Sequence, residues 1–95
     1  MTVQYDVKAA YTAADAAVVT YRTRLKGMYI AVSTGGSNPV TVYDNSSAAS
    51  GTVLFRAGAT VAGAHTVVIP GDGILALDGL YVDTGSADSV TVIYG

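Results

Sequence analysis

Short runs of β-branched and aromatic residues, separated by clusters of Gly, Asn, Asp and Ser, fill the chain from Val18 to its last residue. They include VVTYRTR, GMYIAVS, PVTVYDN, GTVLFRA, HTVVIP, GILAL, LYV and the closing SVTVIYG. A strand roughly every ten residues, with turn residues between strands, is typical of a small all-β sandwich or barrel. We therefore predict a small antiparallel β-sandwich, jelly-roll-like, over residues 18–95.

Residues 1–17 have a different pattern. The segment TVQYDVKAAY alternates only weakly, and TAADAA is rich in Ala without the apolar stripe of a packed helix. Two interpretations remain open, a short helix over one end of the sandwich and an extended N-terminal arm. We favour the arm, because Val3, Tyr5 and Val7 suit a strand that pairs with the sheet edge of a neighbouring subunit.

The chain is poor in charge for its size. Of its 95 residues, 51% are hydrophobic and 13% are charged, which is about half the usual charged fraction. A domain this small buries roughly 63% of its surface, so a monomer leaves much apolar surface in water. Because exposed apolar patches mark interaction sites, we expect a homo-oligomer, a docking surface or both. The alternative is that many of these residues are Ala, which is small enough to tolerate exposure.

The charge and cysteine content exclude several classes of partner. A net charge of −2 provides no field that attracts nucleic acid or an anionic membrane, so neither is expected as a partner. The absence of Cys excludes disulfides and Cys-ligated metals. The first residues lack the basic and apolar regions of a secretion signal, and no apolar run reaches transmembrane length. We expect a soluble protein that is made in a cytoplasm.

The run around residue 25 carries the densest positive charge. Alternation places Arg22, Arg24 and Lys26 on one face of a strand, and these are three of only five Lys and Arg residues in the chain. After Gly27 the apolar side chains fall on the face that carried the cations. We therefore predict a bulge or bend at Gly27, which re-aims the side chains that follow it.

Turn residues predict how the later strands connect. The segments 40–43 and 52–56 are expected to form a hairpin with a long loop. The Pro-Gly pair at 70–71 suits a type II turn, and the Asp-Gly pair at 78–79 predicts another turn. The last strand, at 90–95, is expected at a sheet edge or a subunit contact.

No set of residues predicts catalysis, a metal site or a cofactor. Nucleophilic catalysis needs a nucleophile, a base and an orienting group, and the chain has one His, His65, at an expected strand start. The GxSxG and phosphate-loop patterns are absent. Asp72, Asp78, Asp83 and Asp88 lie in or near expected turns and are too sparse for a Ca²⁺ loop. We interpret them as turn-stabilising residues.

The cationic stripe is the one charged feature with a defined geometry. It has two open interpretations, a solvated strand face and a contact with carboxylates of a partner. Single-stranded nucleic acid is disfavoured, because Tyr21 lies on the opposite face from the cations. The seven Tyr are spread along the chain, which favours core or interface roles over a sugar platform. The residues predicted to contact a partner are Val3, Tyr5, Val7, Arg22, Arg24, Lys26 and Arg56.

Four segments resemble motifs of small virion structural proteins of tailed bacteriophages, especially phages of marine and freshwater bacteria. They are RTRLKGMYI, GTVLFR, VVIPGDGILALDGLYV and the terminal SVTVIYG. Members of that group share an arginine-lysine-glycine strand start, a V-x-F-[KR] strand, an I-P-G-[DE]-G-I turn and a terminal V-T-V-x-Y-G. The resemblance covers about residues 20–95 and consists of strand and turn patterns. It implies a structural role in a virion.

On this resemblance we expect a non-enzymatic capsid decoration, or cement, protein. It would dock as a homotrimer over junctions between major capsid protein subunits, at the capsid surface, after synthesis in the host bacterial cytoplasm. In that role Arg22, Arg24, Lys26 and Arg56 would fix the register through carboxylates of the shell. The alternative is a tail, fibre or head-spike module that binds a host-surface glycan. A cellular carbohydrate-binding module is a further alternative.

Overall fold

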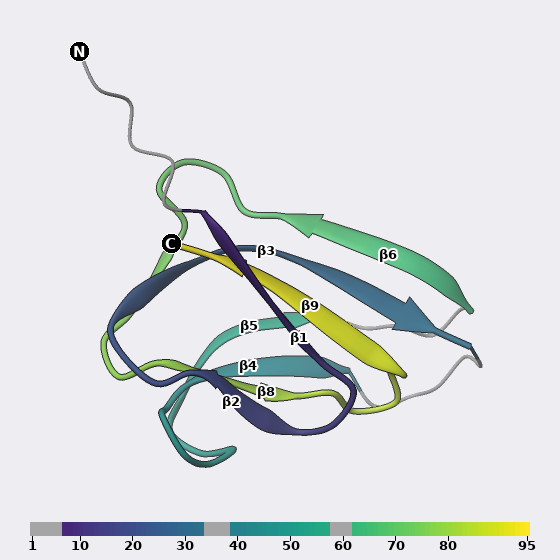
Figure 1. Ribbon diagram of the computed structural model, residues 1–95, viewed down its shortest axis with the longest axis horizontal. Coiled ribbons are helices and arrows are strands. Elements are labelled where there is room, and N and C mark those ends of the chain that lie inside the picture. Colours follow the sequence, from purple (N-terminus) through teal and green to yellow (C-terminus); the bar gives the residue numbers. More distant parts are fainter. Residues whose placement is uncertain (1–6, 34–38, 58–61) are drawn as a thin grey trace.

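The computed structural model describes residues 7–33, 39–57 and 62–95, which form two packed antiparallel sheets without a helix (Figure 1). The predicted small all-β sandwich is confirmed. The strands are β1 (Lys8–Thr12), β2 (Ala16–Val19), β3 (Thr23–Val32), β4 (Val40–Asp44), β5 (Thr52–Ala57), β6 (Gly63–Val68), β7 (Ile74–Ala76), β8 (Leu80–Asp83) and β9 (Ser89–Tyr94).

The strand order is that of a jelly roll. Sheet A has the order β1-β9-β3-β6, with the short β7 also paired to β3, and sheet B has the order β2-β8-β4-β5. With β7 set aside, each sheet alternates strands from the start and the end of the chain, so the chain winds across both sheets as a double Greek key. Figure 1 shows the two layers, with β1, β9, β3 and β6 in one and β2, β8, β4 and β5 in the other.

The inner faces of both sheets form one hydrophobic core. Strand alternation turns every second residue inward, and these positions hold mostly Val, Leu and Ile. Sheet A contributes Leu25, Met28, Ile30, Val32, Ala76, Val90 and Val92, and sheet B contributes Val19, Val40, Val42, Leu80 and Val82. All twelve are at most 5% exposed, so they form a buried core in the described part of the chain and fix the two outer faces relative to each other.

The long strand β3 contains the predicted bulge, after which even-numbered residues point inward instead of odd-numbered ones. Leu25 pairs with Tyr94 and Gly27 pairs with Ile93, so Lys26 is the extra residue without a partner in β9. Leu25 therefore points into the core, Lys26 points outward, and the strand resumes with its apolar residues inward. A glycine is needed at position 27 because a Cβ there would lie 2.7 Å from the carbonyl oxygen of Val67.

The N-terminal part of the chain differs from the predicted arm. Residues 8–12 form β1, which pairs with β9 of the same chain, and residues 16–19 form β2, which pairs with β8. The expected boundary after residue 17 thus falls inside a strand, and from Lys8 onward the segment belongs to the sandwich. The last strand, β9, does not lie at a sheet edge, because β1 covers the edge that β9 would otherwise present. The alternative, a subunit contact, stays a prediction.

The predicted hairpin of β4 and β5 is confirmed. The last residue of β4, Asp44, connects this hairpin to a neighbouring loop through its carboxylate. The Asp44 carboxylate accepts hydrogen bonds from the backbone N–H groups of Leu77 (3.0 Å), Asp78 (2.8 Å) and Gly79 (3.4 Å). These residues connect β7 in sheet A to β8 in sheet B, so Asp44 fastens a crossing between the layers. Partial desolvation opposes ionisation, but the three N–H donors outweigh it and lower the pKa of Asp44 below its ordinary value.

Replacing Asp44 with Ala removes three hydrogen bonds with backbone N–H partners and is expected to lower the free energy of unfolding by about 1–2 kcal/mol at pH 7. The loss is no larger because the carboxylate is partly solvated. Because the folded-state pKa of Asp44 is lowered, its contribution is present above the unfolded-state pKa of about 3.9 and is lost as the pH falls through the folded value. Urea unfolding at pH 7 and pH 3 should therefore show a smaller difference between wild type and Asp44→Ala at pH 3. Asp78→Ala, an exposed neighbour, is the control. An equal difference at both pH values would contradict the role of the ionised carboxylate.

Candidate interaction surfaces

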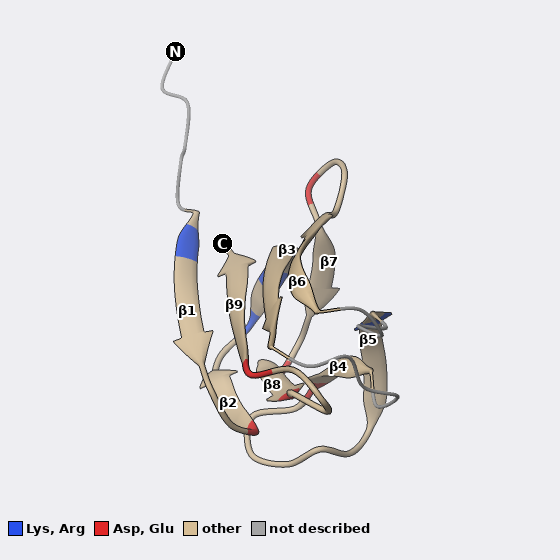
Figure 2. Ribbon diagram, turned by 90° about the vertical axis from the view of Figure 1, so that its right-hand side faces the viewer, with Lys and Arg blue, Asp and Glu red and all other residues tan. Residues whose placement is uncertain are grey.

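The outer face of sheet A carries a continuous uncharged surface. The uncharged face consists of outward-pointing residues of β1, β9, β6 and the second half of β3. In Figure 2, β6 and β9 carry neither the blue of Lys and Arg nor the red of Asp and Glu along their strands. Its members are Ala9, Tyr11, Tyr29, Ala31, Ala64, Thr66, Val68, Thr91 and Ile93.

Pairing between strands arranges these side chains in rows. Tyr11 pairs with Thr91, Thr91 with Tyr29, and Tyr29 with Thr66, which makes one row across four strands. Tyr11 is 68% exposed, Tyr29 47% and Val68 79%. No described element covers this face, so its aromatic and aliphatic groups are in contact with water. A contiguous surface of this kind is typical of an interaction site.

The predicted cationic stripe is present only in part. Arg24 and Lys26 both point outward from the first half of β3, on the same side as the uncharged face, and both are half-buried. Arg22 is exposed in the connection before β3. Arg56 lies on β5 in sheet B, so the structure does not bring it together with the other cations.

Two backbone hydrogen bonds fix the position of Arg24 beside Gly95. The N–H of Arg24 donates to the carbonyl of Gly95 at 3.1 Å, and the N–H of Gly95 donates to the carbonyl of Arg24 at the same distance. Next to them the hydroxyl groups of Tyr21 and Tyr94 are hydrogen-bonded, and this bond, together with desolvation, raises the pKa of Tyr94. Arg24 is therefore held on a well-braced part of sheet A.

Of the N-terminal residues predicted to contact a partner, Val7 lies just before β1 and is 53% exposed. Val3 and Tyr5 lie outside the described residues. The strand that was expected to join a neighbouring subunit is partly used within the chain, because β1 pairs with β9.

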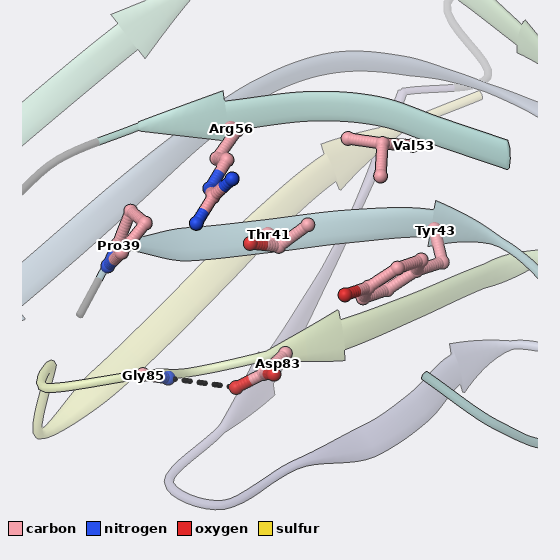
Figure 3. A pocket seen from close by; sticks show the side chains of 7 residues that line it. All are labelled: Pro39, Thr41, Tyr43, Val53, Arg56, Asp83 and Gly85. Carbon is pink, nitrogen blue, oxygen red and sulfur yellow. Dashed lines mark hydrogen bonds between the residues drawn. The ribbon is translucent and has the colours of Figure 1, made fainter. Parts of the chain in front are cut away.

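A pocket of about 260 Å³ lies on the outer face of sheet B, over β4, β5 and β8 (Figure 3). Its base is a row in which Thr41 on β4 pairs with Arg56 on one side and with Asp83 on the other. In the next row, Tyr43 pairs with Val53 and with Tyr81. The lining residues are Pro39, Thr41, Tyr43, Val53, Arg56, Asp83 and Gly85.

The polar groups of the pocket differ in their partners. The Asp83 carboxylate accepts a hydrogen bond from the N–H of Gly85 at 3.0 Å, which confirms its predicted role in a turn and leaves further lone pairs open. Arg56 is exposed and forms no ion pair or hydrogen bond with a described residue. Thr41 is 6% exposed at the base. The pocket thus places a hydrogen-bond donor, Arg56, and an acceptor, Asp83, on opposite sides of the Thr41 hydroxyl group.

Thr41, Tyr43 and Asp83 are not among the contact residues predicted from the sequence. The alternation in PVTVYDN and in LYVD does indicate that Thr41, Tyr43 and Asp83 point away from the core. It does not show that β4 lies between β5 and β8, and only that strand order brings Arg56 and Asp83 to one pocket.

Within the described ranges, no group of three or more His, Asp or Glu residues is placed to hold a metal ion. The same residues contain no helix long and apolar enough to cross a membrane. Comparison of the chain with family models, curated proteins and solved structures finds no match.

Proposed function

We propose that the protein is a non-enzymatic virion component, a capsid decoration protein that forms a homotrimer through sheet A and docks on a shell of major capsid protein. The observation that carries this proposal is the uncharged face of sheet A, which is uncovered in the described structure. The jelly-roll fold supports it by analogy only, since viral capsid and lectin domains share this architecture.

The uncharged face has the chemistry of a subunit interface. Tyr11, Tyr29 and Val68 offer aromatic and aliphatic area, and Thr66 and Thr91 offer hydroxyl groups that hydrogen-bond after water is removed. No charged side chain on this face has to be desolvated. Around a threefold axis, the β1–β9 half of one face would meet the β3–β6 half of the next, which closes the ring without leaving a face exposed.

Docking on the shell would use the cations next to this face. Arg24 and Lys26 lie on the first half of β3, beside the uncharged face, and would pair with carboxylates at junctions between capsid subunits. Each protomer needs only a small contact, because a trimer engages the shell at three points and the second and third contacts form at high effective concentration.

Thr91→Arg is the most direct test, because Thr91 lies at the centre of the uncharged face on β9. The wild-type protein is expected to have a solution mass three times the 9.6 kDa of the chain by light scattering coupled to size exclusion. The variant is expected to be a folded monomer, since three like charges close to the axis cost several kcal/mol. It should also fail to co-sediment with empty heads that lack the protein.

Two further variants separate assembly from docking and from damage to the fold. Thr52→Arg makes the same substitution at an exposed position of β5 in sheet B, and should leave the trimer intact. The double variant Arg24→Ser/Lys26→Ser should remain trimeric and lose binding to the heads. A monomeric wild-type protein, or a Thr91→Arg variant that still forms trimers, would contradict assembly through sheet A. Unchanged head binding by the double variant would remove the two cations from the docking surface.

A further inference from the structure

We propose that the pocket on the outer face of sheet B binds a cyclic polyol, a single ring of a neutral saccharide. The pocket lies on the opposite side of the sandwich from the uncharged face, so this binding activity is independent of the proposed assembly. In a trimer built through sheet A, it would remain open to the surroundings.

The size of the pocket limits the ligand to a small one. Its volume of about 260 Å³ is just below the range of roughly 300–1,000 Å³ that is typical of pockets for drug-sized molecules. A single six-membered ring is a ligand of the right scale. A second ring would lie over Tyr81, which pairs with Tyr43 and extends the outer face beyond the pocket.

The polar groups favour hydroxyl ligands over charged ones. Arg56 on β5 can only donate hydrogen bonds, and the Asp83 carboxylate on β8 can only accept them, with β4 between the two. A hydroxyl group both donates and accepts, so adjacent hydroxyls of one ring can satisfy Arg56 and Asp83 together. A simple anion would gain from Arg56 but would be repelled by Asp83, and a simple cation would meet the reverse.

The remaining walls fit the less polar side of a sugar ring. Figure 3 shows the Tyr43 ring along the pocket with its hydroxyl directed towards the Thr41 end, and Val53 on the side of β5. The C–H groups of a sugar can pack against the Tyr43 ring and Val53, while the Thr41 and Tyr43 hydroxyls reach its edge. Few convergent polar groups beside an apolar wall are the usual composition of a small-molecule site.

Weak binding by one pocket is the expected behaviour. A ring of about a dozen non-hydrogen atoms in an open pocket is expected to bind with a dissociation constant on the order of 1–10 mM. Three pockets on one trimer, and many trimers on one particle, would convert this into firm attachment to a surface that carries many copies of the sugar. The partner class is therefore a dense neutral glycan.

The test is a titration of the ¹⁵N-labelled protein, followed by two-dimensional NMR, with glucose, galactose, mannose and N-acetylglucosamine, each up to about 100 mM. At least one sugar is expected to shift the backbone signals of Thr41 and Gly85 and the side-chain Nε signal of Arg56. Arg56→Gln and Asp83→Asn should each weaken this binding at least tenfold, because each removes one charge-assisted hydrogen bond. Arg22→Gln, at an exposed arginine in the connection before β3 and outside the pocket, should leave it unchanged.

Several results would overturn the proposal. One is the absence of shifts at Thr41, Arg56 and Gly85 with all four sugars, and another is equal binding by wild type, Arg56→Gln and Asp83→Asn. Shifts with glycine or sodium acetate and not with sugars would show a site for charged ligands or peptide groups instead. The monomeric Thr91→Arg variant should still bind the sugar, so a failure here and a failure of the trimer can be told apart.

Discussion

Replacing Gly79 with Ala is expected to lower the free energy of unfolding by about 3 kcal/mol or more, out of a total of roughly 5–15 kcal/mol for a small domain. Gly79 is buried directly before β8 and has φ +153°, a conformation that strains any residue with a Cβ. The added Cβ would also lie 2.3 Å from the carbonyl oxygen of Val19. Relief requires the backbones of β2 and β8 to move apart, which disrupts their pairing. Urea unfolding followed by circular dichroism measures the effect.

Gly63→Ala is a closely matched control for this prediction. Gly63 has φ +129°, in the same region of backbone conformation, but a Cβ there would meet no atom within 4 Å. Gly63→Ala is therefore expected to cost only the backbone strain, about 1–2 kcal/mol. Equal losses of stability in the two variants would contradict this explanation. They would show that the close contact with the Val19 carbonyl oxygen is not the reason for a glycine at position 79.

Ile30→Ala is expected to destabilise the protein by about 2–5 kcal/mol. Ile30 is fully buried in the second half of the central strand β3, where it pairs with Val90 on one side and His65 on the other. The substitution removes buried methylene and methyl groups and leaves a cavity between the sheets, which strands on both sides can only partly fill. Its unfolding midpoint in urea should fall with little change in the slope.

Tyr29→Ala provides the contrast, because Tyr29 is the adjacent residue and points out of the opposite face. It is 47% exposed, so its loss is expected to cost about 1 kcal/mol or less in the folded monomer. Both variants should be compared on the Thr91→Arg background, where assembly adds nothing to stability. In the wild-type background, Tyr29→Ala should weaken the trimer. A stability loss as large as that of Ile30→Ala in the monomer would show that the outer face is part of the fold rather than an interface.

These two positions illustrate how one strand serves two functions in the proposed decoration protein. Inward residues such as Ile30 hold the sheets together, and outward residues such as Tyr29 would contact other copies of the chain in the proposed trimer. The bulge at Lys26 divides β3 further, because the cations Arg24 and Lys26 point outward up to the bulge and only uncharged residues point outward after it. The proposed docking and assembly surfaces therefore adjoin on a single rigid strand, which fixes their relative positions.

Local sequence patterns predicted much of the fold and little of the pocket. Alternation and turn residues located most of the strands, the bulge at Gly27 and the hairpin of β4 and β5. Local patterns did not predict the strands within residues 8–17. The weak alternation there does not indicate which strand of the sandwich has an unpaired edge for this segment. That edge belongs to β9, at the other end of the chain.

The alternation of apolar and polar residues and the low content of charged residues can be read along the chain, and together they predict an all-β sandwich with too few charges to cover its outer surface. Which outward residues meet depends instead on the order of the strands in each sheet. Arg56, Thr41 and Asp83 come from three segments, and they form one pocket because β4 pairs with β5 on one side and with β8 on the other. The jelly roll likewise sets β1 beside β9 and gathers an uncharged face from four strands. These contacts form because strands that are distant in sequence pair with each other. Local residue patterns do not indicate which strands will pair.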